Sequence, residues 1–466
     1  MKSNIIILII LSFFLTGATI IQSTGSAESA TINKVPINDA KKTESLPDLG
    51  STSKVMTKVD VIPFRANSIT NSPGRIIGTT YYDFQTIGST GSRIVKDSLN
   101  GIHICWMNGI GTWSGNRWVY YNFLDEFRNP AWSGGISVST IQGAGFCQID
   151  INDDNAAVIA YHNFDLSVKA AVDAGRGFGL FTLYDVPNEY PGGNRFCWPY
   201  LTVDRNERIH VVFSENATGG GDFLMGGYTR SDDDSIMIFD TLMDRSAIVV
   251  SSNVDDKVAI VYTKPIDDGT EPNYYNNDVV YIESPDGVTW DFTDKINITN
   301  YLYDDTIRAY TDLDAVYDFD GDLHIIWTTP GYFADDGTIT VDACLLWHWS
   351  QATGINLVAD GWWPSYPGAW NRSISKMSIG VNVYNNLYAL WSQFDDIDVS
   401  AGGWSNGDLY YNYSLDQGVT WAEPENITNS YTEDCLPGDC ESDHWSTLSE
   451  IVDDSLYICY LEDKDA

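Results

Sequence analysis

Five arginines recur at one position of a repeated unit in a chain that is strongly acidic. The 466 residues contain 26 Lys and Arg against 64 Asp and Glu. A guanidinium group binds carboxylate or sulfate through paired hydrogen bonds, so these positions predict an anion-binding site. Alternatively, each arginine ties neighbouring acidic loops together. The five residues, each just before the first predicted strand of a unit, are Arg93, Arg195, Arg245, Arg308 and Arg372.

The unit that carries these arginines occurs seven times. It consists of a strand, a short turn of Asp, Asn or Gly, and a second apolar strand that ends in an aromatic residue. These strands are apolar on both faces, which is typical of a sheet packed between two others. The closing aromatics are Trp106, Tyr161, Phe213, Tyr262, Trp327, Trp391 and Tyr460, at spacings of 49 to 69 residues.

A period of this length fits one blade of a β-propeller. Residues 71–466 are therefore predicted to form an all-β propeller of four-stranded antiparallel blades, with seven blades expected and six as the alternative. Because the first strand of each blade lines the central channel, the five arginines are expected to surround one mouth of that channel. His444 takes the corresponding place in the seventh unit.

The two ends of the repeat region predict how the ring closes. The seventh unit has its first two strands, 447–452 and 456–460, and the segment 75–84 has strand character before the first unit. An incomplete blade would leave an exposed sheet edge, so segment 75–84 is expected to be the outer strand of the last blade. One strand of a four-stranded blade is still missing, which would also fit a fragment of a longer protein.

Two hairpin turns share a second motif, S-x-D-x-G-x-T-W. In each, the Asp is predicted to accept backbone N–H groups of its own turn, the Gly to supply a positive φ, and the Trp to pack back on the hairpin. The full copy has Ser414, Asp416, Gly418 and Trp421, and a copy one residue shorter has Ser284, Asp286, Gly287 and Trp290. The motif resembles the Asp-box repeat of sialidase-like β-propellers, which lies on outer turns away from the active-site mouth. The motif therefore indicates a β-propeller fold and does not locate an active site.

The resemblance to sialidases also implies a catalytic set. That family uses three arginines for the substrate carboxylate, a Tyr nucleophile paired with a Glu, and an Asp acid/base. Arg93 lies in Ser-Arg-Ile-Val, which keeps the Arg-Ile of the family's first arginine motif and lacks its aromatic residue and its Pro. Arg308 and Arg372 would be the later members by their order. Among 27 Tyr and 64 acidic residues, the Tyr, Glu and Asp are not assigned, so the catalytic residues are unknown.

Other candidate sites have structural explanations. His103, His210 and His324 occupy one place in three units, where equivalent side chains point between blades and not toward a shared metal. The acidic run 318–322 matches a hairpin turn better than a calcium loop. No metal site and no cofactor are predicted beyond weak Ca²⁺ association. Exposed aromatics such as Trp362, Trp363 and Trp404 would either stack on sugar rings or pack on their own blade.

The N-terminus and the composition indicate a secreted protein. Lys2, an apolar run from 5 to 21 and small residues up to Ala30 predict a signal peptide over residues 1–30, with an uncleaved anchor as the alternative. Residues 31–70 are a polar leader. Cys435 and Cys440 are predicted to form a disulfide, and the other five cysteines to be buried thiols. The net charge of −38 argues against nucleic acid and anionic membranes.

These observations predict a secreted or cell-surface monomer that binds glycans or extracellular proteins, with no membrane insertion after signal cleavage. The alternative is a sialidase-like glycoside hydrolase acting on anionic sugars. The third possible function is that of a surface repeat protein with a purely structural role.

Overall fold

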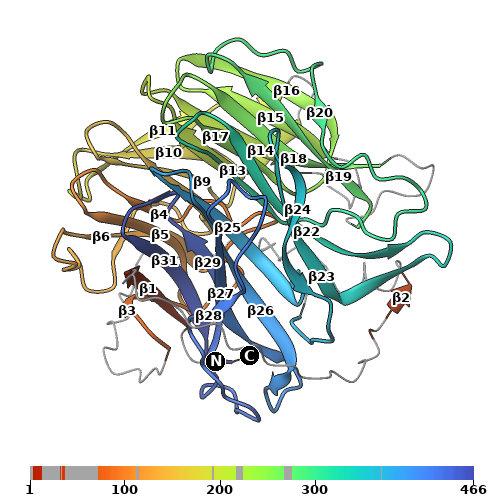
Figure 1. Cartoon of the computed structure of the whole chain (residues 1–466). Helices are drawn as coiled ribbons and strands as arrows, with labels where there is room; N and C mark the ends of the chain where they lie inside the picture. Colours follow the sequence, from red (N-terminus) through yellow and green to blue (C-terminus); the bar gives the residue numbers. More distant parts are fainter. Residues whose placement is uncertain are drawn as a thin grey trace.

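Seven β-sheets form a closed ring (Figure 1). The computed structural model describes residues 4–12, 32, 34–36, 72–111, 115–190, 194–216, 224–266, 275–368 and 370–465. The described residues contain strands and no α-helix, and so no helix that could cross a membrane. The predicted seven-bladed propeller, built mostly of four-stranded antiparallel blades, is confirmed.

Each blade runs outward from an inner strand. Blades one to four are β4 (Ile94–Lys96), β5 (Ile102–Gly109), β6 (Arg117–Leu124) and β7 (Ile136–Ser137); β8 (Gly145–Ile151), β9 (Ala157–His162), β10 (Val168–Asp173) and β11 (Phe181–Val186); β13 (Asn194–Val203), β14 (Ile209–Glu215), β15 (Leu224–Arg230) and β16 (Asp233–Met243); and β17 (Ala247–Ser251), β18 (Val258–Pro265), β19 (Asn277–Ser284) and β20 (Ile296–Asn297). Blades five and six are β21 (Leu313–Tyr317), β22 (Leu323–Phe333), β23 (Thr338–Ser350) and β24 (Gly354–Gly361); and β25 (Ile374–Asn382), β26 (Leu387–Val399), β27 (Ser405–Ser414) and β28 (Glu425–Asn426).

Three short strands extend these sheets. β12 (Glu189–Tyr190) pairs with β13, and β2 (Lys34–Pro36) pairs with β23. β30 (Ile451–Val452) runs parallel to β25.

The apolar cores lie between neighbouring blades. The largest core joins side chains of blades three, four and five, including Tyr228, Val261 and Trp327. The inner strands of successive blades also contact one another around the axis. Because each sheet is covered on both sides, its strands need apolar residues on both faces, which explains the continuous apolar runs in the sequence.

Blade seven closes the ring with strands from both ends of the chain. Its order is β29 (Ser442–Leu448), β31 (Ser455–Asp463), β1 (Asn4–Ser12) and β3 (Arg75–Thr80). The prediction that segment 75–84 shares a sheet with the seventh unit is confirmed, although the strand ends at Thr80. Its direct partner is β1, which pairs with β3 on one side and with β31 on the other.

The third strand of this blade comes from the apolar run that predicts a signal peptide. Residues 6–9 are buried in the sheet, at 0–5% exposure. The slot that the sequence leaves empty is thus filled by apolar residues of the N-terminus. Cleavage within residues 1–30 is not tested by this arrangement and stays a prediction. Most of the predicted leader, 31–70, lies outside the described residues.

Both Asp-box turns are held by their carboxylates. Asp286 accepts the N–H groups of Val288 and Thr289 at 2.9 and 2.6 Å and the Thr289 hydroxyl at 2.9 Å. These bonds lower the pKa of Asp286 to about 2. Asp416 accepts the N–H and hydroxyl of Thr420 at 2.9 and 2.7 Å.

The tryptophans of the two turns reach beyond their own hairpins. Trp290 lies 4.9 Å from the ring of Tyr228 in blade three, and Trp421 lies 5.5 Å from the ring of His348 in blade five. Each Trp therefore packs on the preceding blade. Gly418 has φ 90°, and a Cβ there would meet the His348 ring at 2.0 Å, so this turn requires glycine for both reasons.

Replacing Asp416 with alanine is expected to lower the free energy of unfolding by about 1 kcal/mol, because the turn loses acceptors for its N–H and hydroxyl groups while water can replace part of them. Chemical denaturation of Asp416→Ala measures this change. Any ligand binding by the folded variant should equal that of the wild type. Weaker binding at unchanged stability would contradict a structural role for this turn.

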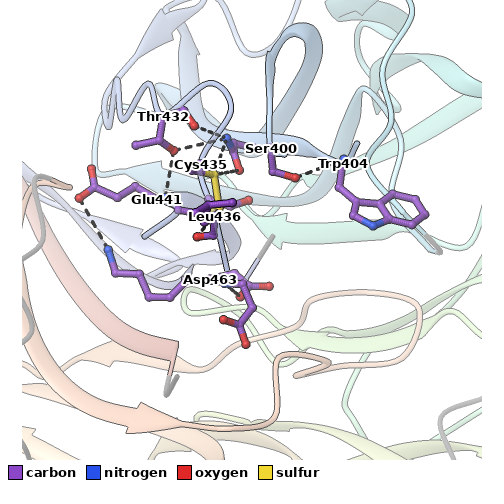
Figure 2. Close-up of a disulfide and its surroundings, with 12 residues drawn as sticks. Ser400, Trp404, Thr432, Cys435, Leu436, Glu441 and Asp463 are labelled. Carbon is purple, nitrogen blue, oxygen red and sulfur yellow. Dashed lines mark hydrogen bonds and ion pairs between the residues drawn. A yellow bond between two sulfur atoms is a disulfide. The ribbon is translucent and has the colours of Figure 1, made fainter. Parts of the chain in front are cut away.

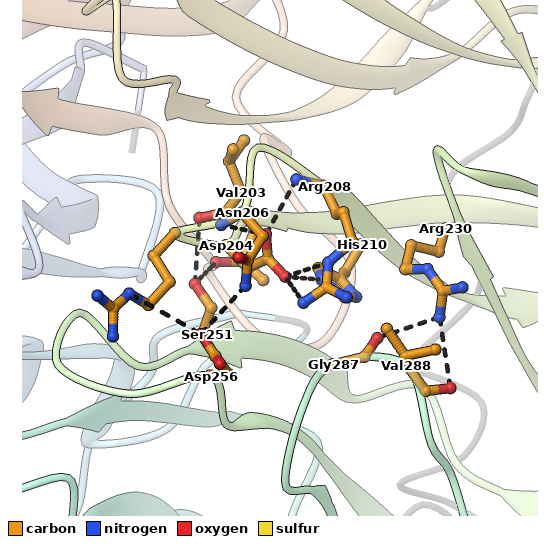
Figure 3. Close-up of polar contacts among 12 residues, drawn as sticks. Val203, Asp204, Asn206, Arg208, His210, Arg230, Ser251, Asp256, Gly287 and Val288 are labelled. Atoms are coloured by element: carbon orange, nitrogen blue, oxygen red, sulfur yellow. Dashed lines mark hydrogen bonds and ion pairs between the residues drawn. The ribbon is translucent and has the colours of Figure 1, made fainter.

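The three equivalent histidines form buried networks inside their own blades. His103 contacts Asp97 at 3.3 Å and the Tyr121 hydroxyl at 2.7 Å. His210 contacts Asp204 at 3.1 Å (Figure 3). It also contacts the Tyr228 hydroxyl at 2.8 Å.

The remaining members of these networks support the same structural role. His324 contacts Asp318 at 3.4 Å and His348 at 2.9 Å. Asp318 also accepts N–H groups of its own turn between β21 and β22, so the acidic run 318–322 is a hairpin turn as predicted. Burial lowers the pKa of His103 and His210, so these rings are neutral supports for the first hairpin of each blade.

Candidate functional site

The segment between β3 and β4 crosses one end of the central channel. We call residues 84–92 the axial plug. Phe84 lies 5.1 Å from the ring of Trp445 in blade seven and 6.4 Å from that of Phe146 in blade two. It also packs against the cluster that contains Tyr275, Tyr310 and Trp370 of the fourth to sixth blades. The side chain therefore lies on the axis, among residues from most of the ring.

Hydrogen bonds hold the rest of the plug. Gln85 exchanges hydrogen bonds with the backbone of Met107 in blade one, at 2.9 and 3.0 Å. The Tyr200 hydroxyl of blade three contacts the carbonyls of Ile87 and Ser89 at 2.5 and 2.6 Å. Residues 85, 86, 87, 89 and 90 are 0–1% exposed. The channel mouth, where the sequence predicts an anion-binding site, is filled by the chain itself.

The arginines at this mouth are buried beside the plug. Arg93, Arg245, Arg308 and Arg372 are each 2–4% exposed. Arg372 lies 4.1 Å from the ring of Tyr310, and Arg245 lies 5.7 Å from that of Trp198. Arg93 donates to the carbonyl oxygen of Trp445, and burial lowers the pKa of Arg93.

Arg308 and Arg195 differ from these three. Arg308 donates to Asn276 at 3.1 Å, and its two terminal nitrogens donate to backbone carbonyls of the loop before it, at 2.7 to 3.4 Å. Arg195 is about half exposed and pairs with Glu189 at 2.5 Å. Four of the five predicted ligand-binding arginines thus meet at the mouth as structural groups. A ligand would contact them only if the axial plug moved.

Other ionisable groups around the mouth are also buried. Burial, followed by the charges of Arg93 and Lys376, lowers the pKa of His444 to about 3, and its Nε2 lies 3.8 Å from Asp463. Burial raises the pKa of Asp342 to about 6, against the lowering effect of Arg372. Among the described residues, no group of three His, Cys, Asp or Glu side chains is arranged to hold a metal ion directly.

The loops of blade six carry an exposed aromatic pair on the same face as the plug. Trp404 is 55% and Tyr366 is 44% exposed. Their loops are joined because Tyr366 N donates to the Ser405 hydroxyl at 2.8 Å and Ser405 N donates to the Tyr366 carbonyl at 2.9 Å. Gly368 lies under the indole, and a Cβ atom added to this glycine would lie 4.0 Å from the Trp404 ring. We call Trp404 and Tyr366 the aromatic platform.

A disulfide loop supports this platform. Cys435 and Cys440 are bonded as predicted, and the five remaining cysteines are buried thiols. Ala401 N donates to the Cys435 carbonyl at 3.0 Å, and Asp434 N donates to the Val399 carbonyl at 2.8 Å. In Figure 2 the Trp404 indole extends away from this loop. The disulfide thus fixes the hairpin that presents the tryptophan.

The other aromatics named from the sequence are packed on the protein. The Trp362 ring lies against Gly331, and Trp363 Nε1 donates to the Phe394 carbonyl at 2.9 Å. Of the three candidate tryptophans, only Trp404 presents most of its ring surface to solvent. Sequence analysis did not single out Tyr366, and Pro367-Gly368 directly after it was the only local sign of an exposed turn.

Comparison with known proteins shows similarity in fold. No protein-family model matches the chain, and no curated protein matches it. A family PL25 polysaccharide lyase described as an ulvan lyase is 13% identical, covers 82% of this chain and 96% of its own, and has a TM-score of 0.46. The polysaccharide lyase Uly1 is 11% identical over 87% and 96%, with a TM-score of 0.44. An α-L-arabinanase of Penicillium chrysogenum is 9% identical over 68% and 92%, with a TM-score of 0.40. The chain is a seven-bladed propeller similar to these carbohydrate-active enzymes.

Proposed function

We propose that this protein is a secreted glycan-binding propeller that holds a neutral polysaccharide on the aromatic platform of blade six. The observation that carries the proposal is the pair of exposed rings, Trp404 and Tyr366, on loops joined by two hydrogen bonds. The C–H face of a sugar ring packs on an aromatic face, and a ring fixed by its loop loses little conformational entropy on binding.

The charges beside the platform favour a neutral ligand. Asp396 near the end of β26, and Glu433 and Asp434 just before Cys435, are exposed. Carboxylates accept hydrogen bonds from sugar hydroxyls and repel sulfate or uronate. A polyanion is the ligand that the five arginines predicted, but four of those arginines are buried. The platform therefore supports binding of neutral glycans better than anionic ones.

Trp404→Ala is expected to weaken binding of a neutral polysaccharide at least about tenfold, which corresponds to ~1.4 kcal/mol. The matched control is Tyr384→Ala, because Tyr384 is 80% exposed on the turn between β25 and β26, at the opposite face of the same blade. Arabinan serves as the neutral probe and ulvan as the sulfated, uronate-containing probe in affinity electrophoresis. Equal losses in both variants, or stronger retention by ulvan than by arabinan, would contradict the proposal.

The same samples separate binding from catalysis. A glycoside hydrolase would release reducing ends from a polymer it binds, and a lyase would release unsaturated sugars. A binding module leaves the polymer length unchanged. Product formation from either polymer would replace the binding function with the enzymatic one.

A further inference from the structure

Hydrogen bonds join the disulfide-bonded segment to the hairpin between β26 and β27. We call residues 431–441 the disulfide loop. Ala401 N donates to the Cys435 carbonyl at 3.0 Å, and Asp434 N donates to the Val399 carbonyl at 2.8 Å. Both bonds are made by a bonded cysteine or by its direct neighbour in the chain. The crosslink therefore fixes the two groups that hold the hairpin.

The bonded residue Ala401 lies in the turn that leads to Trp404. Ser400 N donates to the Trp404 carbonyl at 2.8 Å, and Gly403 N donates to the Ser400 carbonyl at 2.9 Å. The Ser400 hydroxyl also accepts the Trp404 N–H at 3.3 Å. In Figure 2, Ser400 lies between the disulfide and Trp404. A displacement of Cys435 is therefore passed through one turn to the indole.

The disulfide loop is separate from the apolar cores. The cores that the described residues form include none of residues 431–441. Cys435 is partly exposed between the exposed residues Asp434 and Leu436, whereas Cys440 is fully buried. Opening the bond is therefore expected to change the loop and the hairpin and to leave the propeller folded.

We propose that thiol–disulfide exchange at Cys435–Cys440 controls the glycan affinity of the aromatic platform. This inference rests on the proposed glycan binding. In the oxidised protein the loop holds Ala401 and, through its turn, the Trp404 ring in one place. Without the crosslink, the loop and the turn have more conformations in the free protein, and binding a sugar costs the entropy of ordering them. The reduced protein thus binds the polysaccharide more weakly.

A small dithiol such as dithiothreitol supplies the electrons. Its thiolate attacks the Cys435 sulfur, the S–S bond breaks, and Cys440 leaves as a thiolate that takes up a proton. The second thiol of the reductant gives up its proton and attacks the mixed disulfide, which releases Cys435 as a thiol. In total, the protein disulfide is reduced to two thiols and one dithiol is oxidised to a disulfide.

The test equilibrates the full chain with mixtures of reduced and oxidised dithiothreitol at pH 8. Affinity electrophoresis measures arabinan binding, and alkylation followed by mass spectrometry counts the thiols of Cys435 and Cys440 in the same samples. Full reduction is expected to weaken binding about fivefold, and reoxidation should restore it. The loss should follow the reduced fraction of this disulfide across the mixtures. The double variant Cys435→Ser/Cys440→Ser should bind as weakly as the reduced wild type in every mixture.

Hydrogen exchange tests the mechanism without a glycan. Reduction should speed amide exchange in residues 400–404 by about tenfold, because the Ala401 N–H loses its fixed acceptor, and should leave β9 unchanged. The control variant for binding is Trp404→Ala, whose remaining arabinan affinity should change less than about twofold on reduction.

The outcomes separate this inference from the proposed function. Equal arabinan affinity of the oxidised and the reduced wild type would overturn the inference and leave the platform as a binding site. An equal loss on reduction in Trp404→Ala would also overturn it, because the disulfide would then act elsewhere than on the indole. An oxidised wild type that shows the change in exchange but binds no arabinan would overturn the proposed function, and with it the control of affinity.

Discussion

Arg308→Ala is expected to lower the free energy of unfolding by about 3 kcal/mol and to leave the glycan affinity of the folded protein unchanged. The guanidinium group donates to the carbonyls of Leu302, Asp305 and Ile307 at 2.7 Å each. It is 3% exposed and lies 5.0 Å from the ring of Tyr332. Removing it leaves these carbonyls without their donor and opens space beside the Tyr332 ring.

Urea denaturation and arabinan binding measure the two parts of this prediction. Arg195→Ala is the matched control, because Arg195 is half exposed in its ion pair. Its replacement should lower the free energy of unfolding by less than about 1 kcal/mol. Arg308→Lys should recover little, since an ammonium group cannot reach several carbonyls in the plane of a guanidinium. A stable Arg308→Ala protein with lost glycan binding would return the ligand site to the channel mouth.

The second large effect is a gain in stability. At pH 8, Asp314→Asn is expected to be more stable than the wild type by about 2–4 kcal/mol, and at pH 4 the two should be equal. Burial raises the pKa of Asp314 from 3.8 to about 7 in the folded protein. One pKa unit corresponds to about 1.4 kcal/mol. Asparagine keeps an acceptor for the Ile379 N–H, which Asp314 accepts at 2.9 Å, and carries no charge.

The sign of this change in stability with pH follows from proton binding to Asp314. Between about pH 4 and pH 7 the folded wild type holds a proton on Asp314 that the unfolded chain has released, so its stability falls as the pH rises through this window. Buried histidines such as His162 titrate in both proteins and cancel in the difference. Denaturation curves of the two proteins from pH 4 to pH 8 measure this difference in the free energy of unfolding. A constant difference over this range would contradict a raised pKa at Asp314.

The repeat made the fold predictable from the sequence. The repeated strands, such as those that end in Trp106 and Tyr460, are apolar on both faces. Both faces of such a strand are buried only when its sheet packs between two neighbouring blades. The short spacing of Cys435 and Cys440 likewise predicted a local disulfide, which the structure contains. These features depend on nearby residues, so periodicity and spacing reveal them.

The candidate site depends on contacts between distant residues. Phe84 fills the mouth because the crossing from β3 to β4 passes over the axis, and no local pattern marks that path. Four of the five arginines are buried beside this segment, whereas Arg195 is about half exposed, and ligand binding by them stays a prediction. Tyr366 and Trp404 meet through a loop contact between residues 39 apart in sequence. Strand prediction alone does not reveal such a pair.

The most direct measurement is the position of a sugar in crystals soaked with an oligosaccharide of the polymer that binds in solution. We expect a sugar ring packed on Trp404, with Phe84 still in the channel mouth and Arg308 still bonded to its carbonyls. A sugar on the axis in contact with Arg308 or Arg372, with Phe84 displaced, would contradict the platform as the binding site.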